Sequence, residues 1–204
     1  LGRQARRYRL ALDRHSSASG RGGVCWMTPP FLTIEPLTRS AFAPFGTVIE
    51  TQGATRLPIN QETTIRFDAL TAVDVAAGGG SPIISLFRGT RRPDPIAIRL
   101  LERHPLGSQA FYPLVDAEWL VVVATGNADD TAPVFTSLRC FLASGTQGVS
   151  YARGTWHHPL LVLLPEQDFL VVDRAAPAEE VAGKNLDEVW FNGLDGIAAL
   201  IPKI

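Results

Sequence analysis

Three of the four histidines of this chain lie in two short segments whose residue types could support catalysis. Residues 102–109 read ERHPLGSQ, and residues 151–158 read YARGTWHH. Imidazole serves as a metal ligand and as a proton carrier near neutral pH, and both segments lie beside apolar runs typical of strands. The pattern predicts one site built from two halves. The alternative is that these histidines are structural, with satisfied hydrogen bonds in the core or at its rim.

Alternation along an extended strand orients the candidate side chains. Glu102 and His104 are two residues apart and therefore share one face of their strand, and a Pro-Leu-Gly bend then leads to Gln109 on the next strand. His157 and His158 are adjacent, so they point in opposite directions in an extended segment. At most one of these two histidines is therefore expected to enter the same cavity.

The elements that must position these residues are short strands. From residue 30 onward, apolar or alternating runs are separated by Gly, Pro, Asp and Asn. They predict strands at 47–50, 83–88, 97–104, 109–114, 119–125, 137–143, 148–152, 160–164 and 169–173. A short helix capped by Thr38, a turn at 187–191 and glycine-rich loops at 78–80 and 126–130 complete the pattern. Short strands at this spacing predict an all-β sandwich or barrel.

The composition limits the classes of function. With 204 residues, 46% apolar content and a formal net charge of −1, the chain suits one domain and shows no global signal for nucleic acid or membrane. Its two cysteines, Cys25 and Cys140, do not form a disulfide framework, so a reducing, cytoplasmic location is expected. The longest apolar runs fall far short of the roughly 20 residues of a membrane helix. The expected partner is a small molecule or another copy of the chain.

Residues 1–26 differ in composition from the rest of the chain. They are rich in arginine and contain one acidic residue, Asp13, and Met27, the only methionine, follows directly. We interpret this segment as a disordered basic leader that results from a mis-called start. A mitochondrial-type transit peptide and a basic arm that binds nucleic acid are alternatives. The expected division is a leader at 1–26, a catalytic domain at 27–191 and a C-terminal tail at 192–204.

The two histidine segments resemble the two cupin motifs. In those motifs a strand pair carries two histidines and a glutamate, and a later strand, after a Gly-x-x-His turn, carries a third histidine. On that spacing Glu102 occupies the first histidine position and His104 the second, Gln109 occupies the glutamate position, and His157 is the last histidine. The resemblance implies that these four side chains converge inside one barrel, with His158 behind them or facing outward.

More specifically, ERHPLGSQAF at 102–111, QGVSY at 147–151 and WHHPL at 156–160 resemble the ureidoglycolate lyase family. The similarity runs from about Ile34 to Phe191. It implies an all-β, cupin-type double-stranded β-helix, a jelly-roll barrel with a few short helices, over roughly residues 30–191. It also implies release of glyoxylate and urea from (S)-ureidoglycolate in allantoin (purine) degradation, by a soluble homodimer.

The same resemblance implies a divalent metal, nickel in this family, and no organic cofactor. The candidate ligands are His104, Gln109 and His157. Glutamine is a weaker ligand than the glutamate of the common cupin motif because it carries no charge, so loose binding is expected.

Cleavage of this substrate, a carbinolamide with a carboxylate, requires three groups. A base removes the hydroxyl proton, an acid protonates the departing ureido nitrogen, and a cation holds the carboxylate. His104 or His157 is the expected base because a neutral imidazole accepts a proton at pH 7. Glu102 is a second candidate for proton transfer if burial raises its pKa. A bound divalent cation would acidify the hydroxyl further.

The cation that holds the carboxylate is expected to be an arginine, because a guanidinium matches a carboxylate with two parallel hydrogen bonds. Arg66 and Arg88 are the candidates, and the alternative for each is a surface pair with a nearby acid such as Asp68. Arg91 and Arg92 resemble a solvated charge run instead. The other substrate-binding candidates are Gln109, His158 and Tyr151, of which the last could equally be a core aromatic.

Two other classes of function remain open at this point. One is another small-molecule cupin enzyme, a metal-dependent oxygenase or an isomerase; an oxygenase typically uses two histidines and a carboxylate, and one histidine of the usual spacing is replaced here. The other is a non-enzymatic ligand-binding cupin such as a sensor, but the sequence shows no DNA-reading helix pair. Neither nucleic acid nor a membrane is an expected partner.

Overall fold

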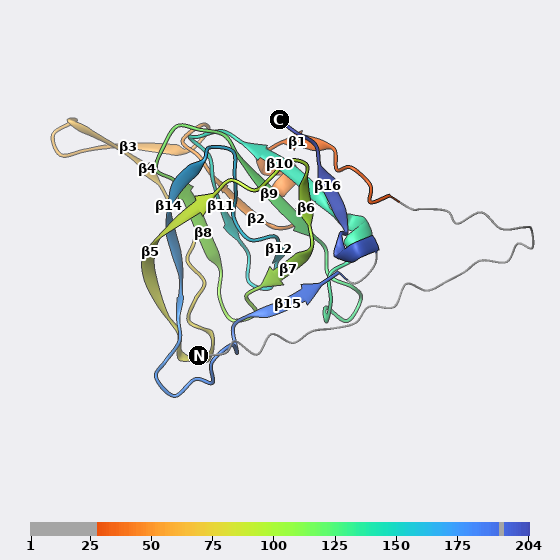
Figure 1. The fold of residues 1–204 in the computed structure, drawn as a ribbon. Helices are drawn as coiled ribbons and strands as arrows, with labels where there is room; N and C mark the ends of the chain where they lie inside the picture. Colours follow the sequence, from red (N-terminus) through yellow and green to blue (C-terminus); the bar gives the residue numbers. More distant parts are fainter. Residues whose placement is uncertain (1–27, 192–193) are drawn as a thin grey trace, which may run out of the picture.

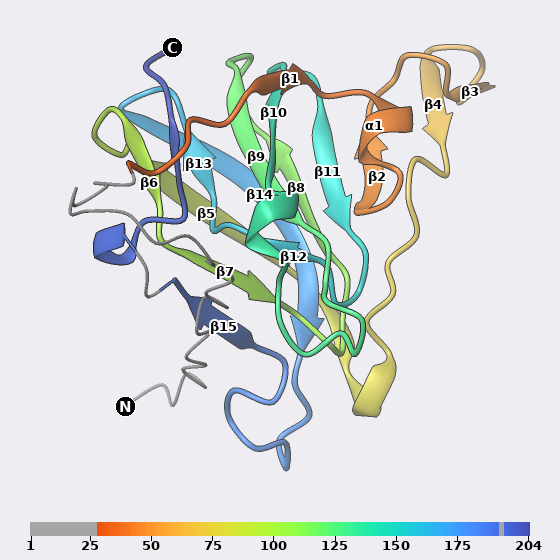
Figure 2. The same cartoon turned by 90° about the vertical axis from the view of Figure 1, so that its right-hand side faces the viewer.

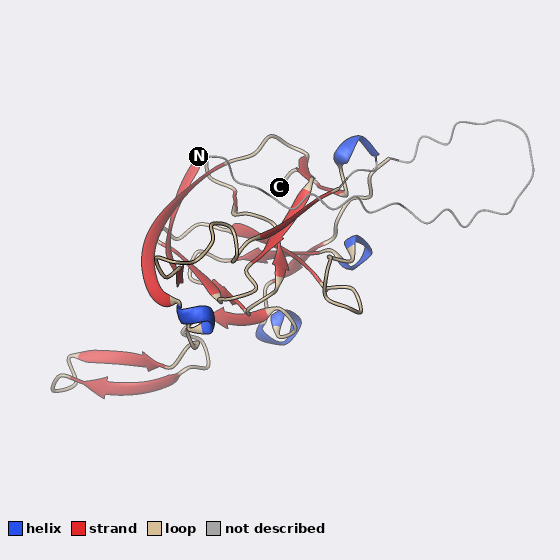
Figure 3. Cartoon of the chain, turned by 90° about the horizontal axis from the view of Figure 1, so that it is seen from below, coloured by secondary structure: helices blue, strands red, loops and turns tan. Residues whose placement is uncertain are grey.

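The computed structural model describes residues 28–191 and 194–204, and the predicted leader at 1–26 lies outside the described residues. The described chain consists mainly of strands, with a few helices of one turn (Figures 1 and 3). Two sheets face each other around a common core, so the predicted all-β, cupin-type fold is confirmed. Among the described residues, no helix is long and apolar enough to cross a membrane.

The first sheet has seven strands in the order β1-β10-β9-β12-β7-β15, with β13 also paired to β9. Their bounds are β1 Ile34–Pro36, β7 Leu100–Arg103, β9 Trp119–Ala124, β10 Arg139–Ala143, β12 Trp156–His157, β13 Leu161–Val162 and β15 Asp187–Trp190. The second sheet has five strands in the order β2-β11-β8-β14-β5. Their bounds are β2 Gly46–Ile49, β5 Ser81–Thr90, β8 Gln109–Pro113, β11 Gly148–Tyr151 and β14 Glu166–Ala175.

Two small strand pairs and four short helices complete the described chain. Strand β6 (Ile96–Ile98) pairs with β16 (Ala199–Ile201), and β3 (Thr55–Ile59) pairs with β4 (Thr64–Asp68) in a hairpin that projects from the body (Figure 3). The helices are α1 Arg39–Phe42, η1 Ala77–Gly79, η2 Phe135–Ser137 and η3 Leu194–Gly196. As predicted, Thr38 caps α1: its hydroxyl accepts a hydrogen bond from the amide of Ala41 at 3.2 Å.

Aromatic side chains from both sheets form the main core. Trp119 on β9 lies edge to face with Phe169 on β14, with ring centroids 4.8 Å apart, and Phe111 on β8 packs against Phe169 in the same way at 6.5 Å. Because close-packed side chains resist sliding, this shared core holds one sheet in register with the other. A site with residues on both sheets is therefore held by the whole barrel (Figure 2).

Several predicted elements differ from the observed ones. The strand expected at 97–104 is divided at Arg99 into β6 and β7, which belong to different sheets, and only two residues of 160–164 form β13. The turn expected at 187–191 is wrong, because Asp187–Trp190 is a strand paired with β7. The C-terminal segment expected as a tail contains β16, whose Ile201 is buried in the core. These elements depend on partners far away in the sequence, which local periodicity does not encode.

Candidate active site

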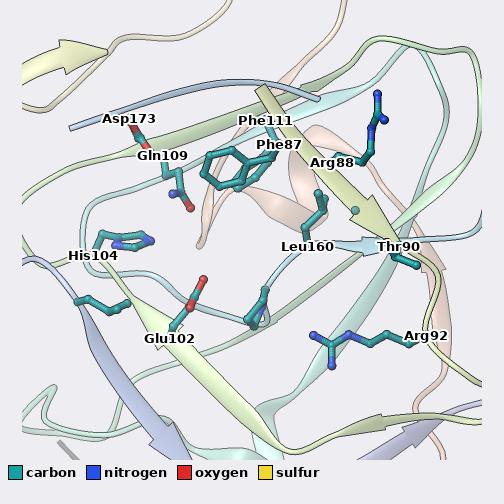
Figure 4. Close-up of a pocket in the computed structure, with 13 residues that line it drawn as sticks. Phe87, Arg88, Thr90, Arg92, Glu102, His104, Gln109, Phe111, Leu160 and Asp173 are labelled. Carbon is teal, nitrogen blue, oxygen red and sulfur yellow. The ribbon is translucent and has the colours of Figure 1, made fainter. Parts of the chain in front are cut away.

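A pocket of about 560 Å³ lies between the two sheets, and Figure 4 shows the side chains that line it. Small-molecule sites typically occupy about 300–1,000 Å³. Glu102 on β7 and His104, just after this strand, come from the seven-stranded sheet, whereas Gln109 on β8 and Asp173 on β14 come from the five-stranded sheet. The apolar side chains of the lining are Phe87, Phe111, Pro159, Leu160 and Leu186.

Glu102, His104 and His157 form one cluster, in which one possible ligand atom from each residue lies within 4.8 Å of the others. Strand pairing produces this arrangement, because His157 on β12 is the direct cross-strand neighbour of Glu102 on β7. His157 Nε2 is 3.7 Å from Glu102 Oε1, and the two imidazole centroids are 5.5 Å apart. The structure therefore brings together the two halves predicted from the sequence.

The hydrogen bonds of the two imidazoles define which nitrogen faces the cluster. Nδ1 of His104 lies 2.8 Å from the carbonyl oxygen of Asn185, and Nδ1 of His157 lies 2.8 Å from that of Thr155. A carbonyl only accepts, so each neutral ring carries its proton on Nδ1 and a lone pair on Nε2. Both Nε2 atoms are buried without a hydrogen-bond partner among the described residues. They are available to accept a proton or to bind a cation.

The donor set fits a divalent metal ion. Two imidazole nitrogens and a carboxylate suit first-row metals such as nickel, and a backbone carbonyl that holds the other ring nitrogen is the usual support of a metal-binding histidine. Glu102 joins the two histidines in this cluster. Gln109 lines the same pocket from the opposite sheet.

Burial keeps His157 neutral. It is only 2% exposed, and its ring stacks on Tyr151 with centroids 4.1 Å apart. Burial, followed by the field of His104, lowers the pKa of His157 to about 3. Burial also raises the pKa of Tyr151, so both rings of the stack are uncharged near neutral pH. Tyr151 thus supports the back of the cluster, and the larger pocket lies in front of it.

His158 lies behind the cluster. It is 3% exposed, burial lowers its pKa to about 4, and its Nδ1 is 2.7 Å from the carbonyl of Pro159. With His157, Tyr151 and Glu102 it lines a separate void of about 10 Å³, which is about the size of one water molecule. Of the two adjacent histidines, His157 joins the cluster and His158 faces this void.

Asp173 is a pocket residue that sequence reasoning missed. It lines the pocket near Gln109. Burial raises the pKa of Asp173, and this effect outweighs the lowering by the carboxamide of Gln109 and the field of His104. Alternation along β14 was the available signal, because Asp173 continues the inward row that includes the buried Phe169 and Val171. A carboxylate at the end of an apolar inward row indicates a polar end of the cavity.

Asn185, which lies just before β15, was also missed. Its backbone carbonyl holds Nδ1 of His104, and its side-chain oxygen accepts a 2.7 Å hydrogen bond from the amide of Leu106. The amide of Gly154 donates to the carbonyl of His104 at 2.9 Å. These contacts fix the bend between the two pocket strands. No sequence pattern pointed to Asn185, because its role depends on contacts 79 and 81 residues away.

The two predicted anchors of the carboxylate are both engaged with acids. Arg66 is exposed on the projecting β3–β4 hairpin, outside the pocket lining, and forms a 2.6 Å ion pair with Asp68. Arg88 lines the pocket, but its guanidinium forms two 2.7 Å hydrogen bonds with the carboxylate of Asp168. In Figure 4 its guanidinium points away from the other polar side chains of the pocket.

Arg92 is exposed, as the predicted solvated charge run requires, whereas Arg91 is not. The guanidinium of Arg91 is half-buried and bonds to Asp94 and to the carbonyl of Leu163. Arg92 lines the pocket, and Figure 4 shows its side chain extending toward the side on which Glu102 lies. Adjacent residues on a loop point in different directions, and only the fold decides which one faces the cavity.

Comparisons with known proteins identify relatives of this chain. A family model described as ureidoglycolate lyase matches residues 29–195. A ureidoglycolate lyase of Burkholderia mallei (strain NCTC 10229) is 54% identical over 161 residues, which is 78% of this chain and 92% of that protein. One from Pseudomonas syringae pv. tomato is 50% identical over 161 residues, 78% of this chain and 89% of that protein. One from Azotobacter vinelandii is 49% identical over 160 residues, with 78% and 92% covered.

Proposed function

This chain belongs to the ureidoglycolate lyase family, and we propose that it cleaves (S)-ureidoglycolate to glyoxylate and urea in allantoin degradation. The observation that carries the proposal is the cluster of Glu102, His104 and His157 beside a pocket of about 560 Å³. The cluster supplies proton acceptors beside a pocket in which a small polar substrate fits. Two histidines and a carboxylate are also the ligand set of an oxygenase, but the family match favours the lyase over an oxygenase, an isomerase or a sensor.

His104 is the proposed base. Its Nε2 has a lone pair, it lines the pocket, and its ring is held in place through Nδ1. It takes the proton of the substrate hydroxyl, the C–O bond becomes the carbonyl of glyoxylate, and the C–N bond breaks with its electrons on the ureido nitrogen. The nitrogen receives the proton and leaves as urea. The proton removed from the hydroxyl is the one that the leaving nitrogen receives, so the reaction consumes no water.

The other site residues support this transfer. Glu102 lies on the same face as His104 and is the second group for proton transfer. Gln109, opposite, offers a carboxamide that can hydrogen-bond the oxygen atoms of the substrate. His157 has a pKa of about 3, so it acts as a neutral donor of a lone pair and a poor base. Tyr151 and His158 hold His157 from behind.

We propose nickel as the divalent cation of this site, which Glu102, His104 and His157 would hold. In that state the Nε2 lone pair of His104 would bind the cation, and proton transfer would pass from His104 to Glu102. When bound, such a cation supplies Lewis-acid polarisation of the substrate hydroxyl. Gln109 lies across the pocket as a further neutral oxygen donor. No organic cofactor is part of the proposal.

The decisive experiment incubates the pure protein with ureidoglycolate and measures glyoxylate, urea and ammonia, with a chelator and with added divalent metals. We expect equal amounts of glyoxylate and urea. Full activity in chelator supports His104 as the base, whereas dependence on Ni²⁺ supports the metal site. Release of ammonia would mean hydrolysis at the ureido carbonyl and would contradict the proposed lyase reaction.

We also propose that the protein is a homodimer that works in the cytoplasm. Strand β5 is the edge of the five-stranded sheet, and its outward side chains Ile84 and Leu86 are 72% and 68% exposed. An apolar edge of this kind is normally covered, and a second copy would cover it. The cytoplasmic location is supported by the low cysteine content, with Cys140 buried and free.

A further inference from the structure

The pocket contains acidic groups, yet the proposed substrate is an anion. Glu102 and Asp173 both line it, so a positively charged side chain that is not already neutralised favours the entry of a carboxylate. Arg88 and Arg92 are the arginines of the lining. Arg88 is occupied by both oxygens of Asp168 and lies near Glu166 as well.

Arg92 has the geometry of an anion anchor. Its exposed side chain extends toward the Glu102 side of the pocket (Figure 4), and within residues 28–191 and 194–204 no ion pair or hydrogen bond uses its guanidinium. Of the two arginines of the lining, Arg92 is therefore the one that is available to an incoming anion.

The backbone that carries Arg92 is held in place. The preceding residue, Arg91, donates its amide to the carbonyl of Pro165 at 3.0 Å, and its guanidinium bonds to Asp94 at 3.0 Å and to the carbonyl of Leu163. Preorganisation of this kind reduces the entropy lost when a ligand is bound. Arg91 thus fixes the loop, and Arg92 remains available for a ligand.

We propose that Arg92 binds the substrate carboxylate and thereby selects 2-hydroxycarboxylates that carry a ureido group. This inference rests on the proposed function. The carboxylate and the hydroxyl of ureidoglycolate are on the same carbon. A fork of two hydrogen bonds from Arg92 therefore fixes that carbon and directs the hydroxyl toward Glu102 and His104, with the ureido group toward Gln109.

The kinetic test compares wild-type protein with Arg92→Ala and Arg92→Lys. An anchor binds the ground state and the transition state alike, so Arg92→Ala should raise KM by about 10- to 100-fold and leave kcat nearly unchanged. Arg92→Lys should recover part of the loss, because an ammonium keeps the charge without the fork. Arg56→Ala is the control: it removes a positive charge from the exposed β3–β4 hairpin, away from the pocket.

A substrate without the charge gives a second readout. With the methyl ester of ureidoglycolate, the wild type and Arg92→Ala should have the same kcat/KM, because the ester has no carboxylate for the guanidinium. A structural role of Arg92 would lower both activities together. An unchanged KM for ureidoglycolate in Arg92→Ala, with KM raised in Arg88→Ala or Arg66→Ala instead, would overturn the proposal.

Binding of glycolate separates this inference from the proposed function. Glycolate has the hydroxyl and the carboxylate but no ureido group, and isothermal titration measures its binding without turnover. We expect the wild type and Arg56→Ala to bind it and Arg92→Ala to bind it at least about 10-fold more weakly. If ureidoglycolate is not cleaved but this difference is found, the proposed function fails and the anchor stands. If Arg92→Ala binds glycolate as the wild type does, the anchor fails.

Discussion

Individual histidines differ here in chemistry because their surroundings differ. His104 lines the pocket, whereas His157 is buried against Tyr151 and its pKa falls to about 3. The same residue type thus lines the pocket at one position, where we propose that it accepts a proton, and is kept neutral by burial at the other. A backbone carbonyl at Nδ1 selects the same tautomer in both rings.

Replacing His104 by alanine tests the accessible member of the pair. We expect kcat for glyoxylate release to fall by about 10²–10⁴-fold, the usual contribution of a positioned proton-transfer group. The variant should keep its circular dichroism spectrum, because the side chain is only partly buried and belongs to the pocket lining. A kcat within a few-fold of the wild type would exclude His104 as the base and as a metal ligand that is required for turnover.

Metal binding by the cluster can be measured without any substrate. Added Ni²⁺ should raise the melting temperature of the wild type, since a ligand at 100 times its Kd stabilises the folded state by about 2.7 kcal/mol. His104→Ala and Glu102→Gln should lose this shift. Glu166→Gln, which changes an exposed carboxylate outside the cluster, is the matched control and should keep it. An equal shift in all four proteins would mean that Ni²⁺ binds elsewhere.

Among the elements, strand parity decides which side chains reach the pocket. Along β14 the row Phe169, Val171 and Asp173 faces inward, so a carboxylate ends an apolar row. Along β5, Arg88 falls in the same row as the exposed Ile84 and Leu86, which explains why its guanidinium pairs with Asp168 outside the cavity. One position along a strand separates a cavity residue from a surface residue.

The C-terminal strand β16 is expected to be part of the stable fold. Ile201 is 0% exposed and packs in the core cluster beside β6, whereas Ile204 is 48% exposed. Ile201→Ala should therefore lower the free energy of unfolding by about 2–5 kcal/mol, the usual loss for a buried isoleucine. Ile204→Ala, the matched control, should change it by less than about 0.5 kcal/mol. Equal effects in urea unfolding would show that β16 does not contribute to the core.

At the scale of the whole molecule, the site exists because two sheets are held face to face. β7 and β12 supply Glu102 and His157, and β8 and β14 supply Gln109 and Asp173. The aromatic contact between Trp119 and Phe169 joins the two sheets near their centre. A change that loosens this core is expected to separate the two halves of the site.

The proposed dimer is tested by charging the edge of the five-stranded sheet. Ile84→Asp combined with Leu86→Asp should convert a particle of twice the chain mass into a monomer, because a carboxylate cannot be buried unpaired at an apolar contact. Light scattering coupled to gel filtration measures the mass. Val181→Asp is the control, since Val181 is equally exposed but lies in the segment before β15. A wild-type monomer, or a double variant that stays dimeric, would contradict this interface.

The sequence alone determined the all-β class, most of the long strands and the family. It also determined that Glu102 and His104 share a face, because alternation is a local property of an extended chain. The resemblance to the cupin motifs implied that His157 belongs to the same site, because the order of the motif residues is preserved along the chain. Short alternating strands were sufficient for the fold class, and the resemblance of the motifs was sufficient for the family.

The tertiary structure alone decided which side chains complete the site. Asn185 reaches His104 across 81 residues, and β15 forms only because β7 offers it an edge. The arginines show the same limit: Arg66, Arg88 and Arg92 have identical chemistry, yet only Arg92 faces the pocket without an acidic partner among the described residues. Local periodicity indicates which residues share a face of a strand. Which face is buried, and what lies opposite it, depends on packing between distant segments.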